Sequence, residues 1–179
     1  MTYRSLDEIF ADKAEVLAEI EAALKPLSPS QLGFHPTPGA WSIAEIAEHL
    51  SIVETGQLRL IRTLTEKAES GGKGPAPVEV TLDERFRDSA NGKIRTRAQS
   101  EPTGGVTAAD SLANMHAVQA GLVELRPRLE RVDVTSVRFQ HPVLGDLTLG
   151  QWVAFAGVHE ERHLRQMRGV MASPSFPRA

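Results

Sequence analysis

The stretch TLGQWVAFAGVHEERHLRQMRGVM (Thr148–Met171) carries the clearest structural pattern in this sequence. Thr148 and Gln151 have the spacing of a capping box, in which a hydroxyl and an amide satisfy free backbone groups at a helix start. Apolar side chains then recur every three or four residues, which is the period of one helix face. The pattern predicts an amphipathic helix over residues 149–171, with His159 and His163 on its apolar face.

Three more segments repeat this pattern. The predicted helices run from Leu6 to Leu24, from Ile43 to Lys67 and from Ala108 to Leu129, and each follows a Ser or Thr with an acidic residue three positions later. A loop with four prolines separates the first two helices at residues 25–41. We therefore expect one all-α domain over residues 1–179, built as a four-helix bundle.

The remaining segments are connections. Residues 66–106 form a long crossover rich in Gly and Pro, with room for a short helix over residues 82–88. Residues 132–147 alternate weakly and predict a short extended turn. The tail over residues 173–179 contains two prolines and is expected to fray.

The composition excludes several classes of protein. The chain has no cysteine, which rules out disulfides, thiolate metal sites and a cysteine nucleophile. A net charge of −3 argues against non-specific nucleic-acid binding, which needs a basic surface. No apolar run approaches the ~18 residues that span a membrane, and the first ten residues lack a signal-peptide core. We expect a cytoplasmic protein that acts on a small molecule, with no nucleic-acid or membrane partner.

Three histidines are candidate metal ligands. His159 and His163 are four residues apart, so both imidazoles lie on one face of the helix, within reach of a single ion. His49 shares the inward face of its own helix with Ile46 and Val53. Buried imidazoles without partners are costly, and a metal ion would use their lone pairs. Three histidines leave at least one coordination position open, as in reactive metal sites. The alternative is that they are hydrogen-bonded core histidines that bind nothing.

The same helix contains the string H-E-x-x-H of zinc proteases, in which the Glu is the general base. We set this interpretation aside because no histidine follows His163 to supply the third ligand. Glu160 is then expected to be an exposed acid. The alternative is that it contacts the ligand His159 and not the metal itself.

The other histidines and two arginines are weaker candidates. His116 is expected to fill the core, His141 to approach the entrance of the site, and His35 to have no special role. Arg162 and Arg165 could bind an anionic substrate, but a solvated helix face is the commoner arrangement.

Two runs resemble a known family. PGAWSIAEIAEHL (Pro38–Leu50) resembles the start of the second helix in the DinB/YfiT-like superfamily, and HPVLGDLTL (His141–Leu149), followed by His159, His163 and Gln166, resembles its final segment. The resemblance implies an up-down-down-up bundle with the long crossover between the second and third helices. It also implies that His49, His159 and His163 bind a divalent metal such as zinc, nickel, iron or manganese, and that the protein is a homodimer.

The resemblance further implies a thiol-dependent enzyme. Characterised members join low-molecular-weight thiols such as bacillithiol or mycothiol to electrophiles, and one is a mycothiol-dependent maleylpyruvate isomerase. An ion in an open three-histidine site could lower the pKa of a thiol, so that the protein needs no cysteine of its own. The expected activity is therefore thiol S-transfer. The alternatives are a metal-dependent hydrolase and a non-catalytic, metal-binding stress-response bundle.

Overall fold

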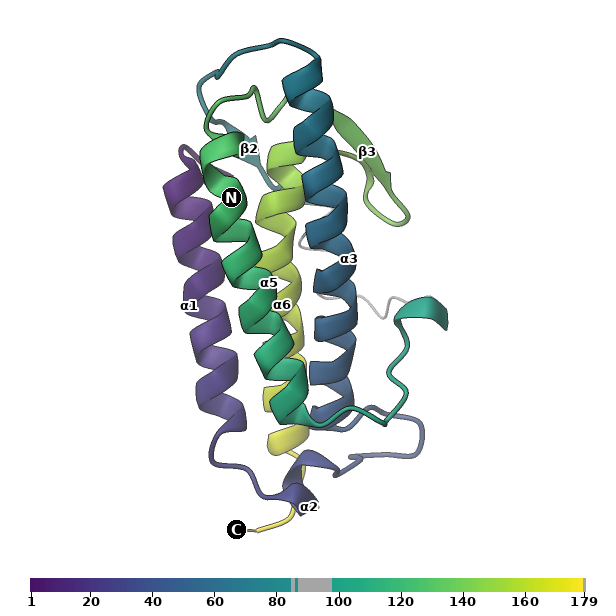
Figure 1. Cartoon of the computed structure of the whole chain (residues 1–179). Helices are drawn as coiled ribbons and strands as arrows, with labels where there is room; N and C mark the ends of the chain where they lie inside the picture. The colour runs from purple at the N-terminus through teal and green to yellow at the C-terminus, as the bar shows by residue number, and fades with distance from the viewer. Residues whose placement is uncertain (85, 87–97, 179) are drawn as a thin grey trace.

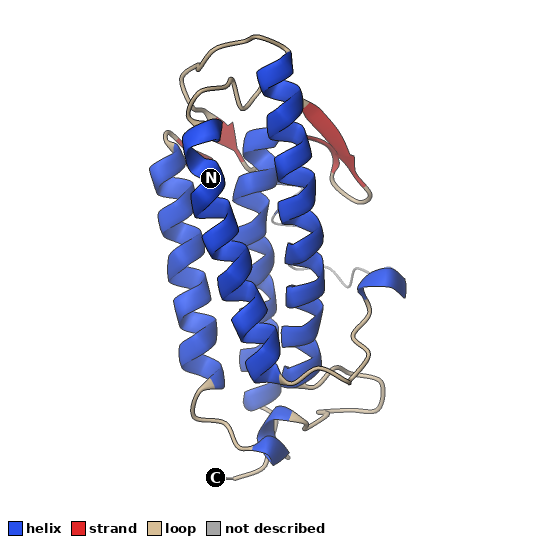
Figure 2. Cartoon of the chain, viewed as in Figure 1, coloured by secondary structure: helices blue, strands red, loops and turns tan. Residues whose placement is uncertain are grey.

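The fold is an elongated four-helix bundle (Figure 1). A computed structural model describes residues 1–84, 86 and 98–178. The long helices are α1 (Leu6–Leu24), α3 (Ile43–Ser70), α5 (Ala108–Leu129) and α6 (Leu149–Met171). The bundle predicted from the sequence is confirmed, and Figure 2 shows how little of it is strand.

The helices begin where their caps predict. Ser42 with Glu45, and Thr148 with Gln151, form complete capping boxes, while Ser5 and Thr107 each accept a hydrogen bond from a first-turn backbone N–H. Helix α3 extends three residues beyond the predicted end at Lys67. No helix breaker occurs there until Gly71, which caps the helix.

Interhelical contacts give the direction of each helix. Two contacts join α1 to α6, and the residue numbers rise together along both helices (Lys13–Glu160 and Glu19–Arg168). Two contacts show the same parallel direction for α3 and α5 (Ser51–Asn114 and Glu69–Arg128). Helices α1 and α5 are antiparallel, because Asp7 contacts Arg126 and Glu21 contacts His116. The order is thus up-down-down-up, and the connection from α3 to α5 must run back along the bundle.

Short elements complete the ends of the bundle. The antiparallel hairpin of β3 (Arg138–His141) and β4 (Gly145–Thr148) leads directly into α6, in the segment that was predicted to be extended. Three pieces were not predicted, because they are too short to show a period: α2 (Pro29–Leu32), η1 (Ala98–Ser100) and the pairing of β1 (Thr2–Tyr3) with β2 (Val80–Thr81). The predicted short helix over residues 82–88 includes residues outside the described part of the chain.

The C-terminal tail corrects one expectation. The ring of Phe176 packs edge-on against Phe34, with centroids 5.5 Å apart. The carbonyl of Pro177 accepts a hydrogen bond from Gln31 Nε2 at 2.9 Å. Fraying is therefore wrong for these residues, because the proline-rich segment at residues 25–41 presents apolar surface that Phe176 covers.

A buried polar layer divides the core. One apolar cluster lies towards the hairpin and contains Phe86 and Trp152, and the other lies towards α2 and contains Ile46 and Met167. Between them along α1, α3 and α6 lie the side chains of Lys13, Glu54 and Glu160, which are 2%, 0% and 0% exposed. Lys13 Nζ donates to Glu160 Oε1 at 2.7 Å and to Glu54 Oε2 at 3.3 Å.

This layer corrects the expectation that Glu160 is an exposed acid. Burial raises the pKa of Glu160 and raises that of Glu54 further, with Lys13 opposing both shifts. The contact from Lys13 Nζ to Glu160 is the shorter of the two, so Lys13 and Glu160 form the tighter ion pair of this layer. The sequence of α6 could not reveal this, because the partner Lys13 belongs to a helix almost 150 positions earlier.

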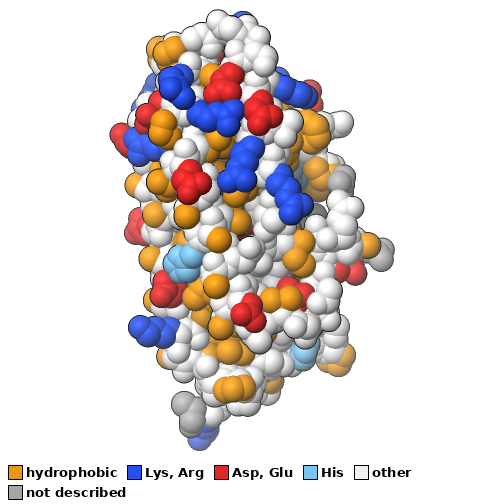
Figure 3. Space-filling view, in the orientation of Figure 1, with side chains coloured by type: hydrophobic (Ala, Val, Ile, Leu, Met, Phe, Trp, Pro, Cys, Tyr) orange, Lys and Arg blue, Asp and Glu red, His pale blue; other side chains and the backbone are white. Residues whose placement is uncertain are grey.

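Charges of both signs cover the outside of the bundle. On the face in Figure 3, Lys and Arg side chains lie beside Asp and Glu side chains. Arg126, for example, contacts Asp7 and Glu130. Among the described helices, none combines the length and the hydropathy needed to cross a bilayer.

Candidate metal centre

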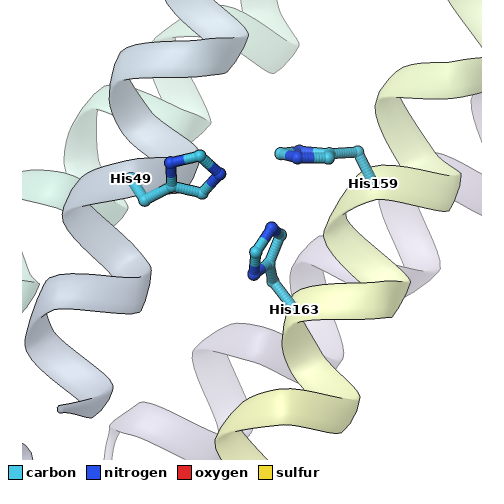
Figure 4. A group of neighbouring side chains, drawn as sticks. All are labelled: His49, His159 and His163. Carbon is cyan, nitrogen blue, oxygen red and sulfur yellow. The ribbon is translucent and has the colours of Figure 1, made fainter. Parts of the chain in front are cut away.

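Three histidines meet between α3 and α6 (Figure 4). His49 comes from α3, and His159 and His163 come from successive turns of α6. One ring nitrogen from each lies within 4.8 Å of the others, and the ring centroids are 4.6–5.4 Å apart. The structure thus brings together the three residues that the sequence singled out as candidate ligands.

Hydrogen bonds orient two of the rings. His49 Nδ1 lies 2.7 Å from the carbonyl of Ser100, and His163 Nδ1 lies 2.8 Å from Gln166 Oε1. Because both partners are acceptors, each Nδ1 must carry the proton, which leaves the lone pair on Nε2. In Figure 4 the ring nitrogen farther from the backbone, Nε2, points towards the gap between the helices in both His49 and His163. This is the arrangement that prepares a histidine to bind a metal.

His159 Nδ1 is buried and has no hydrogen-bond partner among the residues that the structure describes. A buried polar atom without a partner costs free energy, and natural proteins retain such atoms mainly where they have a use. The neutral donor set of three imidazoles suits zinc and the neighbouring divalent transition metals. The residues present therefore fit a divalent metal ion.

Electrostatics keep the three rings neutral. Burial lowers the pKa of His49, lowers that of His159 well below its usual value, and lowers that of His163 to about 3. The positive charge of Arg162 adds to all three shifts. Neutral imidazoles are the form that can donate a lone pair to a metal.

Aromatic rings enclose the cluster. The Trp41 ring lies 4.9 Å from that of His49, and the Phe155 ring lies 5.6 Å from that of His159. His141, at the end of β3, packs on Phe155 with ring centroids 4.9 Å apart and contributes to the lowered pKa of His159. This placement agrees with the expectation that His141 approaches the site.

The crossover is tied to the residue beside His49. Glu48 is 1% exposed and accepts hydrogen bonds from the backbone N–H groups of Thr103 and Gly104 and from the Thr103 hydroxyl, at 2.6–2.9 Å. Burial alone would raise the pKa of Glu48, but these bonds lower it below the usual value. Sequence reasoning missed both Glu48 and the Ser100 carbonyl, because their partners lie more than 50 residues away along the chain.

We expect Glu48→Ala to destabilise the protein by about 2–3 kcal/mol, because three donors of Thr103 and Gly104 lose their buried, charged acceptor. The segment at residues 98–106 should also exchange its amide hydrogens faster, since it loses its attachment to α3. Chemical denaturation and hydrogen exchange measure the two effects. Glu101→Gln, an exposed acid in the same segment, is the control and should change neither. Equal protection of residues 98–106 in the parent and Glu48→Ala proteins would contradict this account.

The structure also places the weaker candidate residues, two histidines and two arginines. His116 is exposed and pairs with Glu21 at 3.2 Å, so the expectation that it fills the core is wrong. His35 is also exposed, and its Nδ1 donates to the carbonyl of Ala40. Arg165 is exposed as expected, whereas Arg162 is only half-exposed, and its Nη1 lies 2.9 Å from His163 Nε2.

A groove of about 420 Å³ lies elsewhere, between α1 and α6. Acidic side chains such as Asp12 and Glu161 line it together with Arg165 and Arg168. None of the three clustered histidines takes part, so this groove is separate from the candidate centre.

Comparisons with known proteins agree with this description. The family model of the DinB superfamily matches residues 14–167. The uncharacterized protein YuaE of Bacillus subtilis strain 168 is 28% identical over 148 residues, which cover 82% of this chain and 87% of YuaE.

Two solved structures share the fold. TT2238, described as a four-helix bundle protein, superposes with a TM-score of 0.62 at 22% identity and covers 92% of this chain and 99% of its own. YfiT from Bacillus subtilis, described as a probable metal-dependent hydrolase with an unusual four-helix bundle topology, has a TM-score of 0.60 at 18% identity and covers 96% of this chain and 88% of its own.

Proposed function

Because this chain belongs to the DinB superfamily, we propose that it is a metal-dependent enzyme whose divalent ion is held by His49, His159 and His163. The favoured reaction is the transfer of a low-molecular-weight thiol to an electrophile. The observation that carries the proposal is the meeting of three neutral imidazoles from two helices, two of them held with the Nε2 lone pair directed inward.

Bound there, zinc, nickel, iron or manganese would supply Lewis acidity, which lowers the pKa of a thiol or of water that reaches the open position. The chain's own residues prepare the site for this. The Ser100 carbonyl and Gln166 fix the orientation of His49 and His163 through their Nδ1 protons. Trp41 and Phe155 pack against the rings and exclude water from one side of each.

The chain has no cysteine, so the thiol of this reaction is a second substrate. Its sulfur forms the new bond to carbon of the electrophile, and the bond from that carbon to the leaving group breaks. The thiol proton passes to solvent, and the displaced group leaves with the electron pair of the broken bond.

A metal-dependent hydrolase is the second candidate. It is favoured by the structural likeness to YfiT, which is described as a probable metal-dependent hydrolase. In that case water takes the place of the thiol, and the same three histidines hold the ion.

One assay separates the two candidates. Protein loaded with each of the four metals is mixed with an activated aryl halide and cysteine, coenzyme A, bacillithiol or mycothiol, and with an activated ester without thiol. Metal-dependent conjugation that disappears in His159→Ala supports S-transfer, whereas ester cleavage alone supports the hydrolase. Absence of both activities in metal-loaded protein would leave a non-catalytic metal-binding bundle.

Gln166→Leu is expected to weaken metal binding by about 10- to 100-fold, because His163 loses the acceptor that fixes its ring. Gln166 is exposed, so the stability of the metal-free protein should change little. Competition with a chelating dye measures the affinity. Gln140→Leu, on the exposed strand β3, is the matched control. Identical affinities of Gln166→Leu and the control would show that Gln166 does not support the site.

A further inference from the structure

Arg162 makes an unusual contact with its neighbour in sequence. Side chains at adjacent helix positions do not normally face each other. Yet the Arg162 guanidinium bends round to place Nη1 2.9 Å from His163 Nε2, the nitrogen that carries the lone pair. An arginine can only donate, so this contact uses the lone pair that a metal ion would need.

The guanidinium is also an electrostatic part of the histidine cluster. Its charge lowers the pKa of His49, His159 and His163. The side chain is half-buried, and burial together with the charge of Arg165 lowers its own pKa. A permanent positive charge therefore lies at the ligating edge of three neutral rings.

From this geometry, and building on the metal-dependent function proposed above, we propose that Arg162 determines substrate specificity by binding an oxyanion of the substrate, a carboxylate or a phosphate. A metal ion and the guanidinium compete for His163 Nε2, so metal binding displaces Arg162 to the edge of the site. There its planar fork of N–H groups matches the two oxygens of a carboxylate or phosphate.

The charge of the assembled site supports the same class of ligand. Three neutral histidines do not offset the charge of a divalent ion held between them. In a partly buried site this charge is screened less than on the surface. A substrate that carries an anionic group offsets the charge of the ion, whereas a neutral substrate does not.

Cobalt(II) provides a direct test, because its visible spectrum reports both its own binding and that of added ligands. The proteins are the parent, Arg162→Gln, Arg162→Lys and Arg165→Gln, the last being an exposed arginine on the same helix. Each is titrated with cobalt against a chelator. The loaded protein is then titrated with acetate, with inorganic phosphate and with imidazole as a neutral probe.

We expect Arg162→Gln to bind cobalt roughly five- to tenfold more tightly, because no hydrogen bond to His163 has to be broken. The same variant should bind acetate or phosphate about 10- to 100-fold more weakly, with imidazole binding unchanged. Arg162→Lys keeps the charge but lacks the planar fork, so its affinity for acetate and phosphate should lie between those of the parent and Arg162→Gln. Arg165→Gln should behave as the parent does. The probe that loses more affinity distinguishes a carboxylate from a phosphate as the preferred group.

Equal affinity of the parent and Arg162→Gln for both anions would overturn the proposal, and so would an equal loss of imidazole binding. Weaker cobalt binding by Arg162→Gln would also overturn the proposal, because it would mean that Arg162 supports the metal site and does not compete with the metal for His163. A parent protein that binds no cobalt contradicts the metal site itself, and with it this inference. Cobalt binding without an effect of Arg162 contradicts the inference alone.

Discussion

Lys13→Met should destabilise the protein by about 3–5 kcal/mol, because it leaves buried carboxyl groups without their cation. Lys13 is 2% exposed and is the cation that contacts Glu54 and Glu160 in the layer between the two apolar clusters. Its α1 backbone lies close to α6 at Gly157, where an added Cβ would be 3.4 Å from Lys13 Cα. The Lys13 side chain is 3% exposed and both carboxylate side chains are 0% exposed, so solvent does not replace the ammonium when it is removed.

Urea denaturation measures this effect, provided that the free energy of unfolding falls with urea concentration at the same slope in the parent and the variant. The matched control is Lys67→Met on the exposed side of α3, which should change stability by less than about 0.5 kcal/mol. The triple variant Lys13→Met/Glu54→Leu/Glu160→Leu should recover most of the loss, because an apolar layer has no charge to satisfy. A Lys13→Met protein as stable as the Lys67→Met control would contradict the description of this layer.

The second large effect concerns His159. In the metal-free protein, His159→Leu should leave stability unchanged or raise it by about 1 kcal/mol, because it removes a buried nitrogen that has no partner in the described part of the chain. The parent should be stabilised by about 4 kcal/mol when free metal exceeds its Kd a thousandfold. For a domain of this size, that corresponds to a rise of roughly 8–16 °C in Tm. His159→Leu should lose this rise.

Thermal unfolding with and without each metal measures the difference. His116→Leu is the control, because His116 is an exposed histidine on α5 away from the cluster, and it should keep the full rise in Tm. An equal rise in His159→Leu would mean that the metal binds elsewhere. No rise in the parent would favour three histidines that only fill the core.

The predictable features were those with a local signal. Capping residues and apolar periodicity placed the helix starts at Leu6, Ile43, Ala108 and Leu149, where the structure has them. The spacing of His159 and His163 set two rings on one face, and the inward position of His49 added a third. Family resemblance supplied the order of the helices, which periodicity does not contain.

The rest depends on contacts between distant residues. Nothing near Glu160 in sequence reveals that Lys13 pairs with it, and nothing near Glu48 reveals that it holds Thr103 and Gly104. His116 follows the apolar period of α5 but pairs at the surface with Glu21 of α1. Polar residues that face a neighbouring helix are therefore the ones for which a single-helix pattern predicts the wrong surroundings.

The central claim is that His49, His159 and His163 hold a divalent metal. Elemental analysis of purified protein without a histidine tag, beside its His163→Ala variant, tests this most directly. We expect about one equivalent of a transition metal in the parent and a large loss in the variant. No metal in the parent, even after incubation with zinc, nickel, iron and manganese in turn, would contradict the claim.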